Sequence, residues 1–220
     1  MKKLYILCYL AMLICVLGTA GLLVISPDTV PVHYNFAGEV DRFGSKYENL
    51  IWTFFSILIG GILMFVAKKV GKKEGQKDEK IILCIALASL IFFMILGGYF
   101  MIKAIQYDPS QSAQMSVDTL KFLGIVLGAM QIVLGVFMPK MKRNSYYGLR
   151  NKWTMANDNV WQKSQRFSGM VAVICGIIMI VMTVLTPSLW SYIMLAVIMT
   201  VWVVLSTAAS YYYYKKEKQE

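Results

Sequence analysis

Three side chains that can ligate a metal lie close together near the N-terminal third of the chain: His33, Glu39 and Asp41. One imidazole and two carboxylates could form a facial metal site. The alternative is that His33 hydrogen-bonds within its own loop while the two carboxylates pair with Arg42 and Lys46. We favour the alternative, because a lone histidine without a second histidine nearby is a weak metal signal. We therefore expect no metal and no cofactor.

Nucleophilic catalysis is not indicated by the sequence either. Ser45 has no nearby base except His33, and neither a GxSxG motif nor a Cys-His arrangement occurs. The four cysteines all lie within apolar stretches and outside any CxxC pair: Cys8, Cys15, Cys84 and Cys175. We expect buried thiols without disulfides, and a protein that is not an enzyme.

A long polar stretch, residues 144–169, separates two apolar runs in the second half of the chain. Gly148 can take the positive φ that a sharp turn after a helix requires. Asn157 or Asp158 can cap a helix that follows. This stretch is too polar to cross a bilayer, so we expect it to lie at the membrane surface.

The helix that follows this cap has an apolar face at helical spacing: Val160, Trp161, Ser164 and Phe167. Such a face predicts a helix that lies along the membrane surface rather than crossing it. The indole rings of Trp153 and Trp161 suit the headgroup layer. Four basic residues would meet anionic lipid there: Arg150, Lys152, Lys163 and Arg166.

Six apolar runs must hold these polar stretches in place: 4–25, 50–67, 81–102, 122–138, 168–186 and 189–210. Each reaches or approaches the roughly 17–25 residues of a spanning helix, and the first is too long for the core of a signal peptide. With 58% hydrophobic and 15% charged residues, the composition lies outside the soluble range. We expect an all-α integral membrane protein with six spanning helices, an ordered loop after the first helix, and an amphipathic segment between the fourth and fifth helices.

The positive charges show which way these helices run. Of the 22 Lys and Arg residues, four lie beside one set of helix ends: Arg42, Lys46, Lys103 and Lys121. All the others lie beside the opposite ends, which the positive-inside rule assigns to the cytoplasm. We therefore expect both termini in the cytoplasm of a multi-pass cell-membrane protein. The net charge of +10 then gives no reason to expect a nucleic-acid partner.

We divide the chain into three parts, which are residues 1–70, 71–80 and 81–220. The first is a helical hairpin with an outer loop, the second a charged cytoplasmic hinge, and the third a region of four helices. In the outer loop an alternating pattern predicts an extended segment: Val30, Val32, Tyr34 and Phe36. Gly38 and Gly44 permit turns there, and further outer turns are expected at 107–117 and 187–188.

The spans contain almost no ionisable residues, and Gln131 is the main polar residue midway through one. Transport of ions or protons usually requires carboxylates or histidines within the membrane. Ion-coupled transport is therefore disfavoured.

Part of the polar stretch contains a distinctive motif of eight residues at fixed spacing: Asn144, Gly148, Arg150, Trp153, Thr154, Val160, Trp161 and Arg166. It resembles the signature of the SdpI family, which comprises multi-pass immunity proteins of Gram-positive bacteria. That pattern usually has Thr-Pro before the first tryptophan and Thr-His before the last arginine. Here those places hold Asn151-Lys152 and Ser164-Gln165.

A second motif occurs in the outer loop: Pro31, His33, Asn35, Gly38, Glu39, Asp41, Arg42, Gly44, Ser45 and Lys46. It resembles the N-terminal domain of unknown function that often precedes the SdpI region. Together the two stretches cover about a fifth of the chain, in the order that the family shows.

The resemblance implies self-protection against a secreted peptide toxin that acts on the membrane. In the best understood member it also implies signalling, in which a transcriptional repressor is held at the membrane. The outer loop would then meet the toxin, and residues 144–166 would meet the repressor. Other functions left open are export of a small amphiphile, an enzyme with an outer-loop metal, and a purely structural membrane subunit.

Overall fold

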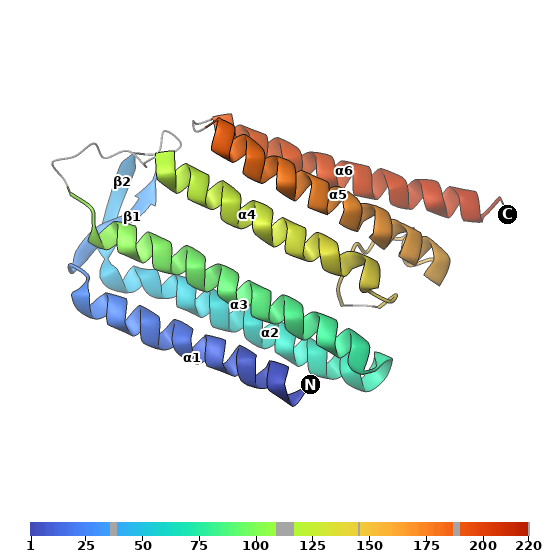
Figure 1. Cartoon of the computed structure of the whole chain (residues 1–220), viewed down its shortest axis with the longest axis horizontal. Coiled ribbons are helices and arrows are strands. Elements are labelled where there is room, and N and C mark those ends of the chain that lie inside the picture. The colour runs from blue at the N-terminus through green and yellow to red at the C-terminus, as the bar shows by residue number, and fades with distance from the viewer. Residues whose placement is uncertain (36–38, 109–116, 145, 187–189, 220) are drawn as a thin grey trace.

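Six long helices run side by side in the computed structural model, which describes residues 1–35, 39–108, 117–144, 146–186 and 190–219 (Figure 1). The helices are α1 (Lys2–Ile25), α2 (Leu50–Glu74), α3 (Gln76–Ile105), α4 (Val117–Phe137), α5 (Asp158–Leu185) and α6 (Trp190–Glu217). All six contain a span that is long and apolar enough to cross a membrane. The expected all-α, six-span membrane fold is therefore confirmed. The turn expected at 187–188 and most of the loop at 107–117 lie outside the described residues.

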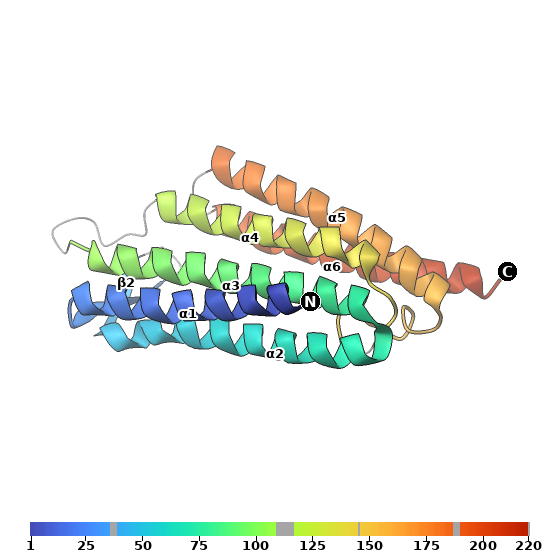
Figure 2. The same ribbon diagram turned by 60° about the horizontal axis from the view of Figure 1, so that its bottom comes forward.

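The helices form two groups of three, which are joined mainly along α3 and α4. Helices α1, α2 and α3 pack on one another, as do α4, α5 and α6 (Figures 1 and 2). In its apolar span α3 is 50% buried, whereas α1 and α6 are each 17% buried. α3 is therefore the central helix, and the outer helices expose many Leu, Ile and Val side chains to the lipid.

A small antiparallel β-hairpin caps one end of the bundle, and both termini lie at the opposite end (Figure 1). Its strands are β1 (Thr29–Tyr34) and β2 (Val40–Ser45), followed by the short 3-10 helix η1 (Lys46–Asn49). The alternating pattern correctly predicted β1. The turn expected at Gly44 is wrong, because Gly44 lies inside β2 opposite Val30. Phe36 and Gly38 lie outside the described residues.

The charged segment at 71–80 is almost entirely helical, although we expected a hinge of that length. Helix α2 continues to Glu74 and α3 begins at Gln76. Only Gly75 leaves the helical conformation, with a φ of 106° that favours glycine. The change of direction is therefore concentrated at one residue.

The expected surface helix and the fifth span are one continuous helix, α5, so the separate surface helix is wrong. The side chain of Asn157 caps it, because its Oδ1 accepts the Val160 N–H at 2.8 Å. Neither proline nor glycine interrupts the sequence between Asp158 and Ser168, so nothing stops the helix from continuing into the membrane. The amphipathic face at its start packs against protein instead of lipid.

Facing glycines bring α4 and α5 into backbone contact. Gly128 faces Gly176, and Gly135, seven residues later in α4, faces Gly169, seven residues earlier in the antiparallel α5. A Cβ on any of the four would lie 2.6–2.7 Å from the carbonyl oxygen of its facing partner. Small residues at such spacing let membrane helices approach closely, which increases van der Waals packing.

Replacing Gly176 by alanine should destabilise the packing of α4 on α5, because the helices would have to separate. Overpacking of this kind costs about 1–3 kcal/mol and should lower the melting temperature of the purified protein in detergent. Gly61→Ala is the matched control, since a Cβ there would meet nothing within 4 Å. Equal melting temperatures for the two variants would contradict the close contact.

Candidate functional site

The β-hairpin brings together two of the three potential metal ligands. His33 Nδ1 lies 2.6 Å from Asp41 Oδ1, and both side chains are exposed. Glu39 turns instead to Asn35, whose side-chain N–H donates to Glu39 Oε2 at 3.0 Å. Among the described residues no three His, Cys, Asp or Glu side chains are placed to hold a metal ion. The hairpin therefore presents His33 and Asp41 as an exposed polar pair, with Glu39 turned away from them to Asn35.

Two ion pairs fix the hairpin to the ends of the neighbouring helices. Arg42 pairs with Glu48 at 2.9 Å, and Lys46 pairs with Asp28 at 3.0 Å. Lys46 also donates to the Ser26 carbonyl just beyond α1. The expected pairing of Glu39 and Asp41 with these two basic residues is wrong, because the register of the strands gives each basic residue a closer carboxylate.

The hairpin also rests on the end of α3 through aromatic side chains. The rings of Phe43 and Tyr107 meet edge to face, with centroids 5.5 Å apart. Tyr34 is half-buried, and its burial raises its pKa, with smaller contributions from Tyr107 and Tyr99. Pro31 lies opposite Phe43 in β1. The hairpin therefore contacts the segment that directly follows α3.

The second patterned stretch lies at the other end of the bundle, in the α4–α5 connection, which we define as residues 141–157. Asn144, near its start, is buried, and its Oδ1 accepts the N–H groups of Tyr146 and Tyr147 at 2.8 and 2.9 Å. Gly148 has a φ of 92°, which confirms the expected turn. A Cβ at Gly148 would also meet Gln165 and Trp161 at 3.1–3.2 Å.

Gln165 holds this turn in place, although the sequence analysis gave it no role. Its Oε1 accepts the Leu149 N–H at 3.1 Å, and its Nε2 donates to the Leu149 carbonyl at 2.9 Å. The side chain is fully buried, so both bonds are shielded from water. The burial of Gln165 could have been inferred from the sequence, because it follows Trp161 by four residues and so lies on the same face of the helix.

Trp161 is 1% exposed, so its expected place in the headgroup layer is wrong. Its indole N–H donates to the Met141 carbonyl at 2.8 Å, which satisfies a backbone group just beyond α4. Val160 beside it is also fully buried. Trp153 is half-buried, and its ring lies 5.1 Å from that of Tyr211 in α6.

A compact turn ties the connection to α6. Asn151 Oδ1 accepts the N–H groups of Trp153 and Thr154, and Asn151 Nδ2 donates to Ser210 Oγ at 2.8 Å. Thr154 is buried, and its Oγ1 accepts the Asn151 N–H at 3.0 Å. Asn151 therefore supplies the turn in a place where the family pattern has a different residue.

Most of the signature residues thus form or support the α4–α5 connection, whereas the two signature arginines, Arg150 and Arg166, are exposed. Within the described residues neither Arg150 nor Arg166 has a salt bridge or hydrogen bond. Arg150 lines a cavity together with the Tyr147–Leu149 turn. Both guanidinium groups are therefore accessible to a partner.

A buried carboxylate joins the connection to α3. Asp78, in the first turn of α3, is 1% exposed and accepts the Tyr147 hydroxyl at 3.2 Å. Burial raises the pKa of Tyr147, and the charge of Asp78 adds to that shift, so the phenol remains a donor. The second oxygen of Asp78 lies 3.9 Å from Lys142 Nζ. This contact was not foreseen from the sequence.

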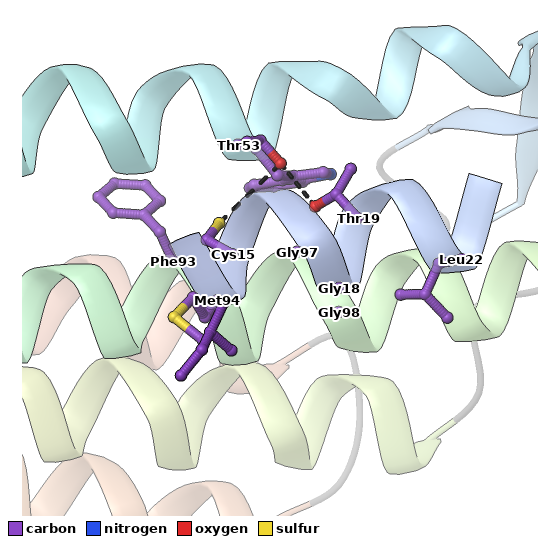
Figure 3. A pocket seen from close by; sticks show the side chains of 11 residues that line it. Cys15, Gly18, Thr19, Leu22, Thr53, Phe93, Met94, Gly97 and Gly98 are labelled. Atoms are coloured by element: carbon purple, nitrogen blue, oxygen red, sulfur yellow. Dashed lines mark hydrogen bonds between the residues drawn. The ribbon is translucent and has the colours of Figure 1, made fainter. Parts of the chain in front are cut away.

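The first three helices enclose a small cavity of about 140 Å³ (Figure 3). The hydroxyls of Thr19 and Thr53 are 2.6 Å apart, and the Cys15 thiol lies 4.0 Å from the latter. Gly97 and Gly98 on α3 also line it. Because the two hydroxyls satisfy one another, the cavity is chiefly apolar.

Gln165→Ala should loosen the turn at Leu149, because it leaves a buried N–H and a buried carbonyl without partners. The cost is about 1–3 kcal/mol per unsatisfied group. Hydrogen exchange at Leu149 should accelerate, as followed by mass spectrometry of peptides from the connection. Gln162→Ala, on the exposed face of the same helix, is the control. Unchanged exchange in Gln165→Ala would refute this role.

Comparison with known proteins agrees with both patterned stretches. Residues 140–210 match the SdpI/YfhL protein family, and residues 10–59 match a domain of unknown function, DUF1648. The Immunity protein SdpI of Bacillus subtilis (strain 168) is 26% identical over 188 residues, which cover 84% of this chain and 83% of that protein. No solved structure matches the chain. With the six-helix fold, these matches show a multi-pass membrane protein that carries a region similar to the SdpI/YfhL family, preceded by a region similar to DUF1648.

Proposed function

We propose that this chain is an immunity protein of the cell membrane, which protects its host against a secreted antimicrobial peptide toxin. The observation that carries the proposal is the similarity to Immunity protein SdpI, which extends over 84% of this chain. That similarity reaches well beyond the two patterned stretches. It is therefore a likeness of the whole membrane protein and not of one motif.

The β-hairpin is the part that we propose meets the toxin. The few basic residues at its end of the bundle favour an outward orientation under the positive-inside rule. His33 and Asp41 project from the two strands with exposed fractions of 61% and 40%. A secreted peptide arriving from outside would therefore encounter a fixed polar pair beside the membrane surface.

We also propose that the chain signals to a cytoplasmic transcriptional repressor through α3. This helix carries the Phe43–Tyr107 contact beyond one end and the Asp78–Tyr147 contact at the other. A toxin that shifts the hairpin would displace α3 and change the support of the α4–α5 connection. The connection, with the exposed Arg150, would then hold or release the repressor.

Protection should fall when the hairpin pair is broken. A sensitive Gram-positive strain without its own immunity gene would express the chain and be challenged with the toxin. We expect His33→Ala and Asp41→Asn to lower the tolerated toxin concentration several-fold, because each removes one side of the pair. Gln162→Ala, at the opposite end, should protect like the unaltered chain. Full protection by both hairpin variants at normal membrane levels would contradict the proposed toxin contact.

Signalling should depend on the contact between α3 and the connection. Tyr147→Phe removes the hydroxyl that Asp78 accepts, so toxin-induced expression of a reporter under the chain's own promoter should fall while protection persists. Arg150→Ala and Trp161→Phe alter the same connection and should act in the same direction. Tyr146→Phe is the matched control, because the Tyr146 side chain is exposed. Unaltered induction in Tyr147→Phe would exclude this route.

A further inference from the structure

Two apolar cavities adjoin in the second half of the bundle and share part of their lining. One has a volume of about 340 Å³ and lies between α3, α4, α6 and the α4–α5 connection. The other, of about 260 Å³, lies between α4, α5 and α6. Leu134 and Trp202 line both, so the two cavities adjoin. We call the pair the α4–α6 groove.

The groove has the length of one membrane leaflet. Its lining extends from Leu127 in α4 to Met138 just beyond that helix, which at 1.5 Å per residue is about 16 Å. The hydrocarbon core of a bilayer is about 30 Å thick, so one leaflet contributes about 15 Å. The groove therefore begins at the α4–α5 connection and ends near the middle of the membrane.

The two ends of the groove differ in chemistry. Its deep part is lined by side chains such as Leu127, Leu195 and Met199. At the connection the lining includes Arg150, whose guanidinium has no salt bridge or hydrogen bond among the described residues. The paired hydrogen bonds between Gln165 and Leu149 fix the backbone beside Arg150. The positive charge of Arg150 thus lies at the end of the α4–α6 groove beside the connection, whereas the rest of the groove is apolar.

A buried amide within the groove also lacks a partner. Gln131 is 4% exposed, and neither of its amide atoms makes a hydrogen bond within the described part of the chain. An unsatisfied buried polar group costs about 1–3 kcal/mol, so such groups usually have a partner in the working protein. Gln131 is therefore a polar position within the otherwise apolar deep part of the groove.

From these observations we infer that the α4–α6 groove binds one anionic phospholipid of the leaflet that contacts the basic side of the protein. Its phosphate pairs with Arg150, and one acyl chain occupies the groove past Trp202. The basic residues concentrated at this end attract anionic lipid to the same leaflet. This inference does not depend on the identity of any toxin.

The test uses the purified full-length chain, stripped of bound lipid in detergent and titrated with phosphatidylglycerol or phosphatidylcholine of identical acyl chains. Native mass spectrometry counts the bound lipid. We expect the first phosphatidylglycerol to bind at least about fivefold more tightly than phosphatidylcholine, from roughly 1 kcal/mol of charge attraction. Arg150→Gln should abolish that preference. Lys152→Gln removes an equal charge two residues away, outside the groove lining, and should retain it.

A second variant tests the acyl-chain half of the site. Ala196 lines the deep part of the groove and is exposed, so Ala196→Phe should fill the groove without disturbing the fold. Both lipids should then bind more weakly, while the melting temperature stays unchanged. Binding of both lipids by Ala196→Phe as in the unaltered chain would overturn the proposal. So would a phosphatidylglycerol preference that survives Arg150→Gln, which would assign Arg150 to an acidic protein partner instead.

Discussion

The backbone contact between α4 and α5 is the constraint on which the second half of the molecule depends. Two pairs of facing glycines hold the helices so close that an added Cβ would reach a carbonyl oxygen at 2.6–2.7 Å. The chain between them must therefore turn back over the helix ends within a narrow space. Its backbone groups cannot all reach water there, so buried side chains must satisfy them.

The polar residues of the α4–α5 connection meet that demand. Trp161 satisfies the Met141 carbonyl, Gln165 satisfies both backbone groups of Leu149, and Asn144 satisfies two N–H groups of the turn. The described part of the connection is consequently held by side-chain hydrogen bonds, although it has no helix or strand before α5. Those hydrogen bonds hold Arg150 at the end of the α4–α6 groove.

The first half of the molecule depends on α3, which is packed against α1, α2 and α4. One end of α3 supports the hairpin through Tyr107, and the other end carries the buried Asp78 against Tyr147. A buried carboxylate is stable only with partners, and breaking such a contact has a large energetic cost. The two patterned stretches, which lie at opposite ends of the bundle, are therefore linked by a single central helix.

Patterns that repeat locally could be interpreted from the sequence. The six spans were found because each apolar run has the length of a bilayer, and β1 because apolar residues alternate from Val30 to Tyr34. The turn at Gly148 and the cap at Asn157 follow from backbone preferences of those residues. The helix that begins at Asp158 was predicted as well, but the burial of its apolar face was not. The sequence pattern of an amphipathic helix is the same whether its apolar face contacts lipid or protein.

The sequence alone therefore determined the membrane class, the positions of the helices and the two stretches that carry the family resemblance, since each rests on composition or on residues near one another in the chain. Tertiary structure decided which polar groups meet. The pairing of Gln165 with Leu149, the contact of Asp78 with Tyr147 and the separation of Glu39 from His33 join or part groups that local spacing does not relate. Helix packing and strand register set those distances, and neither is encoded in a short stretch of sequence.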